Sequence, residues 1–443
     1  MDNSHNPDKP SGREEAQSIS IVQRGNLKTL EQTLRRQWRL GQNIVLCWSA
    51  DERGVLVIFV PHYFLGNYCA AGEVAASGGQ DNEAFVRGLI SGRRRKTRDQ
   101  LFEISERLDI APTFIKLNTA LTEERNVLQA VEQLIKRYGL SYVESRAVLL
   151  FDIVEFSLHT PFEQASQLNS LSYSLNSAYN KLLARGIEIN FARTTTGDGY
   201  YIWNRDLGPA ANRDLFYFML LVVADNAVAR AASRGNTVPV IRTGYHIGGH
   251  YELYQAEGVN PTVFSYIVGD VTIELARMVD LAQPNQILVG DFNCESPIWE
   301  ASDAGRPVPR AAPMIAAPAF VSACNRGLDA VQGTQLSSKP IKSMSCYLSA
   351  SDTEPAASSP RRFRIVDKHG LSRHAYNLQI EMELDGQKLT LGLDANKLPH
   401  RSTRPAESGE DGRERSAATS ADEVIDDLSS LLRKRGTKAM MED

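Results

Sequence analysis

Two aspartates, Asp152 and Asp198, stand beside runs of apolar residues that are typical of β-strands. Asp152 follows the run AVLLF (147–151), and Asp198 stands in a Gly-Asp-Gly turn before YYIW (200–203). Carboxylates at neighbouring strand ends suit a pair of Mg²⁺ or Mn²⁺ ions, because hard cations prefer oxygen ligands. Two such ions assist in-line attack at phosphorus, one at the attacking oxygen and one at the leaving group. With Arg277 further along the chain, the pattern predicts phosphoryl or nucleotidyl transfer.

Composition narrows the class of protein. A chain of 443 residues is long enough for two or three domains. The net charge of -4, with acids and bases interspersed, does not favour general binding to nucleic acid. Five cysteines without a Cys-x-x-Cys pair argue against a zinc site and a disulfide framework, and they fit a reducing cytoplasm. The first residues lack the apolar stretch of a signal peptide, and the run 216–224 is too short to span a bilayer and predicts a buried helix. We expect a soluble, cytoplasmic protein with no membrane and no nucleic-acid partner.

Shifts in composition divide the chain into segments. We expect disorder over 1–20, a mixed α/β N-terminal region of unknown role over 21–120, a linker helix over 121–145, a main domain over 146–350, a linker over 351–361, a small β-rich domain over 362–400 and a charged tail over 401–443. The helix in 121–145 suits a dimerising linker or, equally, a helix packed on its own domain. The basic run at 93–98 is more typical of a solvated loop or helix start than of a phosphate-binding patch.

Strand and helix patterns alternate regularly within the main domain. They predict a strand over 147–153, a helix over 162–185, a hairpin over 187–203, a helix over 213–232, a strand over 238–246, a helix over 271–281 and a strand over 287–289. This alternation predicts an α+β fold.

Five motifs in this region resemble, in order and spacing, the catalytic domains of class III nucleotidyl cyclases. They are FDIVEFS, TTGDGYYIW, RTGYHIGGH, YIVGDVTIELARM and PNQILVG, and they cover roughly 147–348. The resemblance implies a ferredoxin-like βαββαβ domain with a mixed, largely antiparallel sheet. It also implies a head-to-tail homodimer, in which one protomer supplies the metal ligands and the other supplies the residues that read the base and stabilise the transition state.

The resemblance assigns roles position by position. The metal ligands are matched by Asp152, by the backbone carbonyl of Ile153 and by Asp198, and they imply two Mg²⁺ or Mn²⁺ ions. Phe156 and Ser157 begin the turn whose amides receive the triphosphate of a nucleoside triphosphate substrate. Arg277 matches the arginine that stabilises charge at the α-phosphate, a task suited to a permanently charged planar group.

Three positions depart from the purine-using members of the family. Thr194 stands where they place a lysine, Tyr266 where many place an aspartate, and Ile273 where they place the asparagine that orients the ribose. Since lysine and aspartate together read a purine edge, a Thr–Tyr pair leaves a pocket of different shape. Either the chain is an inactive cyclase-fold regulator that binds nucleotide, or it acts on another base; retention of both aspartates and Arg277 favours activity.

The segment 362–400 resembles the sensor-like C-terminal domains of bacterial defence nucleotidyltransferases and cyclases. Together with the altered base readers, it is similar to the pyrimidine cyclases of the Pycsar antiphage systems, whose cyclic UMP or cyclic CMP activates a separate effector with a cyclic-nucleotide receptor. We therefore expect a lyase that uses UTP in preference to CTP, with an adenylyl cyclase as a further alternative. His246 and His250 are interpreted as core and loop residues rather than metal ligands.

Overall fold

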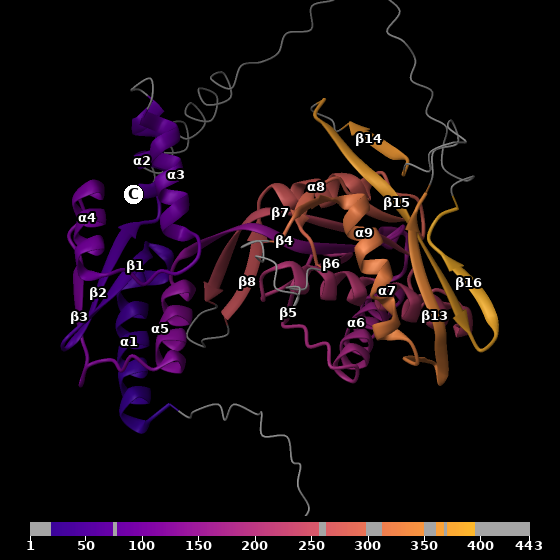
Figure 1. Cartoon of the computed structure of the whole chain (residues 1–443), viewed down its shortest axis with the longest axis horizontal. Coiled ribbons are helices and arrows are strands. Elements are labelled where there is room, and N and C mark those ends of the chain that lie inside the picture. The colour runs from indigo at the N-terminus through magenta and orange to yellow at the C-terminus, as the bar shows by residue number, and fades with distance from the viewer. Residues whose placement is uncertain are drawn as a thin grey trace, which may run out of the picture. The chain divides into compact units, whose positions relative to one another are not determined.

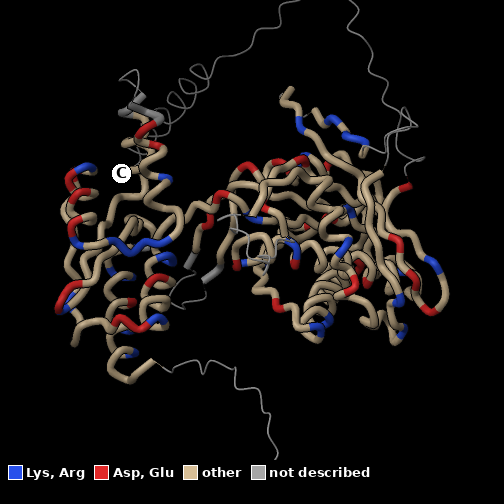
Figure 2. Tube along the Cα trace, viewed as in Figure 1, with Lys and Arg blue, Asp and Glu red and all other residues tan. Residues whose placement is uncertain are grey.

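The computed structural model describes residues 19–73, 78–256, 263–297, 312–349, 360–366 and 370–394. The charged tail over 401–443, most of the segment expected to be disordered (1–20) and most of the linker over 351–361 lie outside the described residues. Acidic and basic residues are interspersed along the described chain (Figure 2).

The N-terminal part is built on an antiparallel sheet in the order β1-β2-β3. Its elements are α1 (Ile21–Trp38), β1 (Asn43–Asp51), β2 (Gly54–Pro61), α2 (Phe64–Glu73), α3 (Gly78–Ile90), α4 (Arg98–Leu108), β3 (Thr113–Lys116) and α5 (Arg125–Arg137). Helix α5, in the segment expected to be a linker, buries Val127, Val131 and Leu134, and the last two share a core with Leu30 and Leu34 of α1. Its apolar spacing therefore serves packing within this part of the chain, which is the second of the two interpretations.

One residue of the basic run is buried rather than solvated. The side chain of Arg94 is fully enclosed, and its guanidinium donates to the carbonyl oxygens of Leu46 and Leu140. The interpretation of this run as a solvated loop or helix start is thus wrong for Arg94. The reason is that the carbonyl oxygens of Leu46 in β1 and of Leu140 accept hydrogen bonds that replace those the guanidinium would make with water.

The remainder forms one large mixed sheet with helices on its faces, and a separate sheet of two short strands (Figure 1). Its elements are β4 (Leu140–Ile153), α6 (Pro161–Leu183), β5 (Phe191–Thr195), β6 (Gly199–Asn204), α7 (Pro209–Ala232), β7 (Ile241–Ala256), β8 (Val263–Val268), α8 (Asp270–Asp280), β9 (Ile287–Gly290), β10 (Asn293–Glu295), β11 (Met314–Ala316), α9 (Ala317–Arg326), β12 (Gln335–Leu336), β13 (Lys339–Leu348), β14 (Arg362–Val366), β15 (Ser372–Leu384) and β16 (Gln387–Leu391). The strand order is β12-β13-β15-β9-β7-β4-β6-β5, and β7 and β9 are parallel whereas the neighbouring pairs around them are antiparallel. The expected α+β class and mixed sheet are confirmed.

The alternation of side chains along β4 separates two layers of core. Leu149 and Phe151 belong to a core with α6, α7 and α9, while Val148 and Leu150 pack with α8 on the other face of the sheet. Successive strand residues point to opposite faces, so Asp152 follows Val148 and Leu150 onto the α8 face. Helix α7 is apolar and long enough to cross a membrane, but 67% of its apolar window is buried in this core, as expected for 216–224.

The C-terminal strands are not a separate domain, contrary to the expectation for 362–400. Strand β15 pairs with β9 through Leu378↔Ile287 and with β13 through Cys346↔Ile380, so it lies inside the main sheet. Its buried residues Leu378, Ile380 and Met382 complete the same core as α7. The sequence predicted an independent domain because the alternation of apolar residues within this segment does not reveal which other strands it pairs with.

Candidate active site

Asp152 and Asp198 meet at one end of the main sheet. Asp152 is the penultimate residue of β4, and Asp198 lies in the turn between β5 and β6. The backbone amide of Ile153 donates to the carbonyl oxygen of Asp198 at 2.9 Å, and Asp152 lies opposite Gly199 in the β4–β6 pair. The two aspartates are therefore neighbours, and the carboxylate of Asp198 lies in the electrostatic field of Asp152.

Glycine is required at both ends of the turn, for a different physical reason at each position. Gly197 has φ +105°, a conformation that residues with a side chain rarely adopt, and Gly199 lies so close to β4 that a Cβ atom there would overlap the carbonyl oxygen of Phe151. Both residues thus fix where the carboxylate of Asp198 stands.

Substitution Gly199→Ala is expected to lower the free energy of unfolding by about 1–3 kcal/mol, because the added methyl group forces β6 away from β4. Gly88→Ala is the control, since a Cβ at Gly88 meets nothing within 4 Å on helix α3 and alanine favours helix. Urea unfolding of both variants measures the difference. Equal stability of the two would contradict the crowding at Gly199.

Several charged side chains lie close to Asp152 and affect its pKa. Burial raises the pKa of Asp152 above its usual range, as do the carboxylates of Asp198 and Asp280, whereas Arg242 lowers it. Arg242, the second residue of β7, lies directly opposite Asp152 and donates through Nε at 2.8 Å and through a terminal nitrogen, both to Oδ2. Arg242 is the first residue of the motif RTGYHIGGH. The sequence did not predict its role, because its pairing with Asp152 depends on the β4–β7 register.

The carboxylates fit divalent cations in donor chemistry. Among the described residues no cluster of three or more His, Cys, Asp or Glu side chains could hold a metal on its own. Six oxygens or more surround Mg²⁺ or Ca²⁺ in proteins, so a metal held by Asp152 and Asp198 needs further oxygens from backbone, phosphate or water. The carboxylates of Asp198 and Asp280 add negative charge near Asp152, which favours binding of a cation. The guanidinium of Arg242 already neutralises part of this charge.

Helix α8 presents a stripe of three residues toward the surface beside this site. Ile273, Arg277 and Asp280 are spaced i, i+4 and i+7, so they share one side of the helix. Arg277 is 30% exposed and its Nη1 lies 3.7 Å from Oδ2 of Asp280, while Ile273 is 47% exposed. The electrostatic effect of Asp280 on Asp152 shows that the stripe ends near the carboxylates.

Gly244 and Tyr201 hold α8 close to the sheet. A Cβ on Gly244 would come within 2.9 Å of Val279 and 3.0 Å of Leu275, so only glycine allows this approach. Tyr201 of β6 donates its hydroxyl to the carbonyl oxygen of Thr272 at 3.0 Å. Burial, together with the charges of Asp280 and Asp152, raises the pKa of Tyr201 to about 12, so the hydroxyl stays protonated and remains a donor at neutral pH.

The two residues expected to read the base lie on strands that contact each other. Thr194 is on β5 opposite Tyr201, and Tyr266 is on β8 opposite Leu253; both are half-buried. Strands β5 and β8 come into contact although they are not hydrogen-bonded neighbours in the sheet. Thr194 shares the face of Tyr201, on which α8 and Asp152 also lie. Tyr266 alternates onto the other face of the sheet, because its neighbour Ile267 packs with α8.

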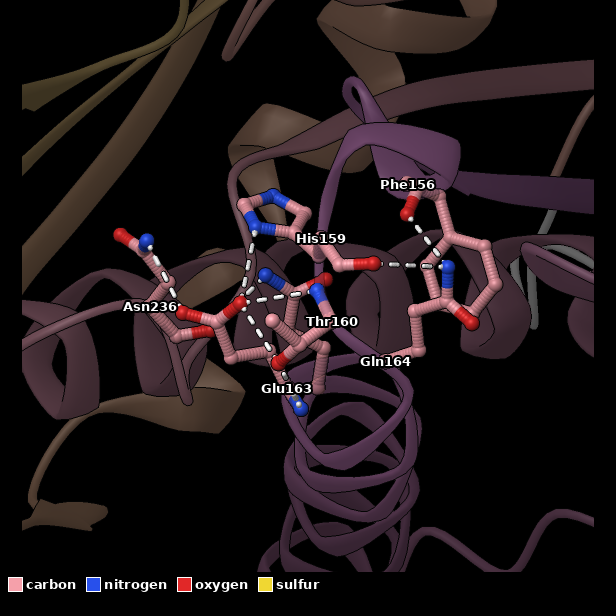
Figure 3. Close-up of polar contacts among 7 residues, drawn as sticks. Phe156, His159, Thr160, Glu163, Gln164 and Asn236 are labelled. Carbon is pink, nitrogen blue, oxygen red and sulfur yellow. Dashed lines mark hydrogen bonds and ion pairs between the residues drawn. The ribbon is translucent and has the colours of Figure 1, made fainter.

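The turn after β4 holds Phe156 and Ser157 in a short 3₁₀ helix, Phe156–Leu158. The side chain of Gln164 donates to the carbonyl oxygens of Phe156 and His159, both at 3.1 Å, and so fixes the turn against α6 (Figure 3). Phe156 packs against the main core, while Ser157 is exposed.

The N-terminus of α6 already holds a carboxylate. Glu163 accepts from the backbone amide of Thr160 at 2.9 Å and the hydroxyl of Thr160 accepts from the amide of Glu163, which is a capping box (Figure 3). Asn236 donates to Glu163 at 3.2 Å from the opposite side. These bonds, led by the backbone amide of Thr160, lower the pKa of Glu163. The backbone amides of Thr160 and Glu163 at the start of α6 are therefore already hydrogen-bonded within the chain.

Glu155 stands just before this turn with φ +55° and ψ +28°, in the left-handed region. Glu155→Gly is expected to raise the free energy of unfolding by about 0.5–1 kcal/mol, because the relief of strain exceeds the entropy that glycine adds to the unfolded chain. Glu188→Gly, an exposed glutamate without a positive φ, should lower it instead. Thermal unfolding checks both signs, and destabilisation by Glu155→Gly would contradict the strain.

The two histidines lie in buried ion clusters. His246 on β7 binds Glu274 of α8 at 2.5 Å, and Gly290 leaves room for its ring. His250 is fully buried beside Arg146, and burial and that arginine lower the pKa of His250 to about 4, so it is neutral at pH 7. His246 is a core residue, as interpreted from the sequence, whereas the interpretation of His250 as a loop residue is wrong, because β7 continues to Ala256 and buries it.

Known structures resemble this chain in fold. The guanylate cyclase domain of RhGC from Catenaria anguillulae, in complex with GTP, is 12% identical, covers 54% of this chain and 97% of its own, and has a TM-score of 0.32. The adenylyl cyclase CyaB from P. aeruginosa is 14% identical over 38% of this chain and 92% of its own, with a TM-score of 0.27. A dimeric guanylyl cyclase domain of the RhoGC fusion protein from Blastocladiella emersonii is 18% identical over 34% and 81%, with a TM-score of 0.28.

No family model and no curated protein matches the chain. The structural likeness to class III nucleotidyl cyclase domains covers about half of the chain, and at these identities and TM-scores it is a likeness of fold only.

Proposed function

We propose that the chain is a homodimeric, Mg²⁺- or Mn²⁺-dependent nucleotidyl cyclase that converts a pyrimidine nucleoside triphosphate, UTP in preference to CTP, to a 3′,5′-cyclic nucleotide. The observation that carries the proposal is the meeting of Asp152 and Asp198, joined by the 2.9 Å bond from the amide of Ile153. Thr194 and Tyr266 support a pyrimidine, because neither residue supplies the charge that a lysine–aspartate pair uses to read a purine edge.

In the proposed reaction the ribose 3′-oxygen forms a bond to the α-phosphorus. The bond from the α-phosphorus to the oxygen that bridges to the β-phosphate breaks, and this oxygen keeps the electron pair and leaves in pyrophosphate. The proton of the 3′-hydroxyl passes to water. Divalent ions held by Asp152 and Asp198 would supply charge neutralisation on the triphosphate and activation of the attacking oxygen.

The chain's own residues supply binding and orientation. Asp152, Asp198 and the carbonyl of Ile153 would hold the ions, and the turn at Phe156 and Ser157 would bind phosphate. Arg277 of the other protomer stabilises the charge that grows on the α-phosphate. Its partial exposure on α8 leaves the guanidinium accessible to a second chain.

The product would act on a separate effector with a cyclic-nucleotide receptor, in antiphage signalling in the cytoplasm. This part of the proposal depends on the resemblance to Pycsar cyclases. Neither nucleic acid nor a membrane is proposed as a partner.

The test is an assay of the purified chain with each of ATP, GTP, UTP and CTP, in Mg²⁺ and in Mn²⁺, with chromatography of the nucleotides and detection of pyrophosphate. We expect cyclic UMP with UTP and a smaller yield of cyclic CMP with CTP. Preferred use of ATP would make the chain an adenylyl cyclase instead.

A second candidate is an inactive regulator that binds nucleotide. Ile273 favours it, because an exposed apolar side chain stands where a ribose-orienting amide is expected, and loss of a positioning contact can cost orders of magnitude in rate. Tight nucleotide binding without cyclic product from any of the four triphosphates would support the regulator and overturn the cyclase.

The base-reading residues are tested by Thr194→Lys combined with Tyr266→Asp. We expect weaker use of UTP and CTP, by about 1–3 kcal/mol in transition-state binding for each change, because the new polar groups lack partners on a pyrimidine. Arg193→Gln on β5 is the control, since Arg193 is adjacent to Thr194 and faces the opposite side of the sheet, where it donates to Ser172 of α6. Unchanged preferences among UTP, CTP and ATP would remove Thr194 and Tyr266 from the base pocket.

A further inference from the structure

A cavity of about 460 Å³ lies on the side of the main sheet that faces α7. Residues of α7, β7, β9 and β16 line it. Ile241 and Thr243 are among them, and they alternate along β7 with Arg242, which bonds Asp152 on the α8 face. The cavity is therefore separate from the candidate active site, and its volume lies in the range of small-molecule binding sites.

One part of the cavity is apolar. Val223, Ala227 and Ala231 recur at intervals of four residues, so they share one side of α7. Ile287 of β9 and Leu391 of β16 add apolar side chains from the sheet. Because the two alanines are small, space remains between α7 and the sheet. The apolar body of a ligand can leave water there.

The cavity also contains a cation. Arg230 lies on the same side of α7 and donates through Nη1 to the side-chain oxygen of Asn285 at 3.2 Å. In the part of the chain that the structure describes, no carboxylate pairs with Arg230. A guanidinium whose partner is a neutral amide keeps an uncompensated charge, and it has further N–H groups that can donate to an anion. The arginine therefore favours a ligand with negative charge.

Bonds within the chain hold the walls of this cavity in place. The buried side chain of Asn226 donates to the carbonyl oxygen of Pro239 at 3.1 Å and so joins α7 to the segment before β7. Gly392 has φ +94°, and a Cβ atom there would come within 2.6 Å of the carbonyl oxygen of Leu378. Glycine thus allows the chain after β16 to lie against β15. A ligand would enter a cavity that already exists, which lowers the entropic cost of binding.

We propose that this cavity binds a small molecule with an apolar body and one anionic group, such as an aromatic carboxylate, sulfonate or phosphate ester. The apolar body lies against the alanines of α7. The anionic group meets Arg230, which is exposed, so that water still reaches the ion pair. The inference is independent of the proposed function, because no residue that lines the cavity is a candidate metal ligand or base reader.

The alternative is an arginine that only stabilises the C-terminal end of α7. Basic side chains near the last carbonyl groups of a helix are favourable because of the helix dipole. Replacement of such an arginine changes stability and leaves the binding of anions unchanged. Replacement of an arginine that binds ligand weakens the binding of an anion and spares that of a neutral molecule with the same rings.

Two fluorescent probes distinguish these cases. Anilinonaphthalene sulfonate is an aromatic anion, and phenylnaphthylamine has the same rings without the sulfonate. We expect both to bind the full chain saturably in fluorescence titrations. Arg230→Met should weaken binding of the sulfonate about fivefold, the size of a partly solvated ion pair. Its affinity for phenylnaphthylamine should stay within about twofold of that of the unaltered chain, since the apolar contacts remain.

Ala227→Trp and Ala231→Trp test the apolar part. Each is expected to weaken binding of both probes at least about tenfold, because the indole takes the space in which the rings of the probe leave water. Two positions are used in case one variant does not fold, and the melting temperature of each variant establishes folding.

Arg234→Met and Ala232→Trp are the matched controls. Ala232 is the last residue of α7 and Arg234 follows the helix, and neither lines the cavity. Both variants should bind the two probes as the unaltered chain does.

Unchanged probe binding by folded Ala227→Trp or Ala231→Trp would overturn the cavity as a binding site, as would the absence of saturable binding by the unaltered chain. The anionic group would be overturned if Arg230→Met left the affinity for the sulfonate unchanged or weakened both probes equally. None of these titrations depends on the formation of a cyclic nucleotide.

Discussion

Asp152→Asn and Asp198→Asn are each expected to lower the rate of cyclic-nucleotide formation at least about a thousandfold, which corresponds to roughly 4 kcal/mol of transition-state stabilisation. Asparagine keeps the shape of the side chain but loses the charge that holds a divalent ion. The structure makes the two losses comparable, because both carboxylates stand at the same end of the β4–β6 pair. Product formation over time, at saturating metal and UTP, measures the effect.

Asp206→Ala is the control for these variants. Asp206 is an exposed residue that follows β6 in the same part of the chain. Its rate should match that of the unaltered chain, and the melting temperatures of all three variants establish that they are folded. Near-normal turnover by either folded asparagine variant would remove the two-metal site from the proposed mechanism.

An equal mixture of Asp152→Asn chains and Arg277→Ala chains is expected to recover about a quarter of the normal activity, although each variant alone is inactive. Half of randomly mixed dimers contain one chain of each kind, and one of the two sites in such a dimer has an intact metal half and an intact Arg277. The exposed stripe of Ile273, Arg277 and Asp280 on α8 is the surface that would face the partner chain.

The control mixture combines Asp152→Asn chains with Asp198→Asn chains. Both changes fall in the metal half, so every site in every dimer stays damaged and no activity should return. Absence of recovery in the first mixture, once chain exchange has been demonstrated with tagged protein, would place Arg277 and the aspartates of one working site in the same chain.

The local elements could be predicted from the sequence because their signals are local. The apolar run in 147–153 predicted a strand and helical spacing predicted α7 and α8, and the structure has these elements at close to the expected positions. The convergence of Asp152 and Asp198 also followed from short-range features, since a Gly-Asp-Gly turn and a strand end are visible in the chain itself.

What could not be predicted depends on pairing between distant segments. Arg242 meets Asp152 only because β4 and β7 pair in one particular register, and a shift of one residue would turn Arg242 to the other face. The place of β15 between β9 and β13 was missed for the same reason. Arg94 was misread because its burial depends on carbonyl groups of β1 and β4, whose positions no pattern within 93–98 reveals.

The position of β15 also determines when the main sheet can close during translation. Strands β9 and β13 both leave the ribosome before residues 372–384, yet each of them pairs with β15. Until β15 emerges, their backbone donors and acceptors on that side are open to other nascent chains, and open strand edges promote aggregation. The central sheet therefore closes late in translation, and a message truncated before residue 372 should yield insoluble protein even though every residue of the candidate active site has been synthesised.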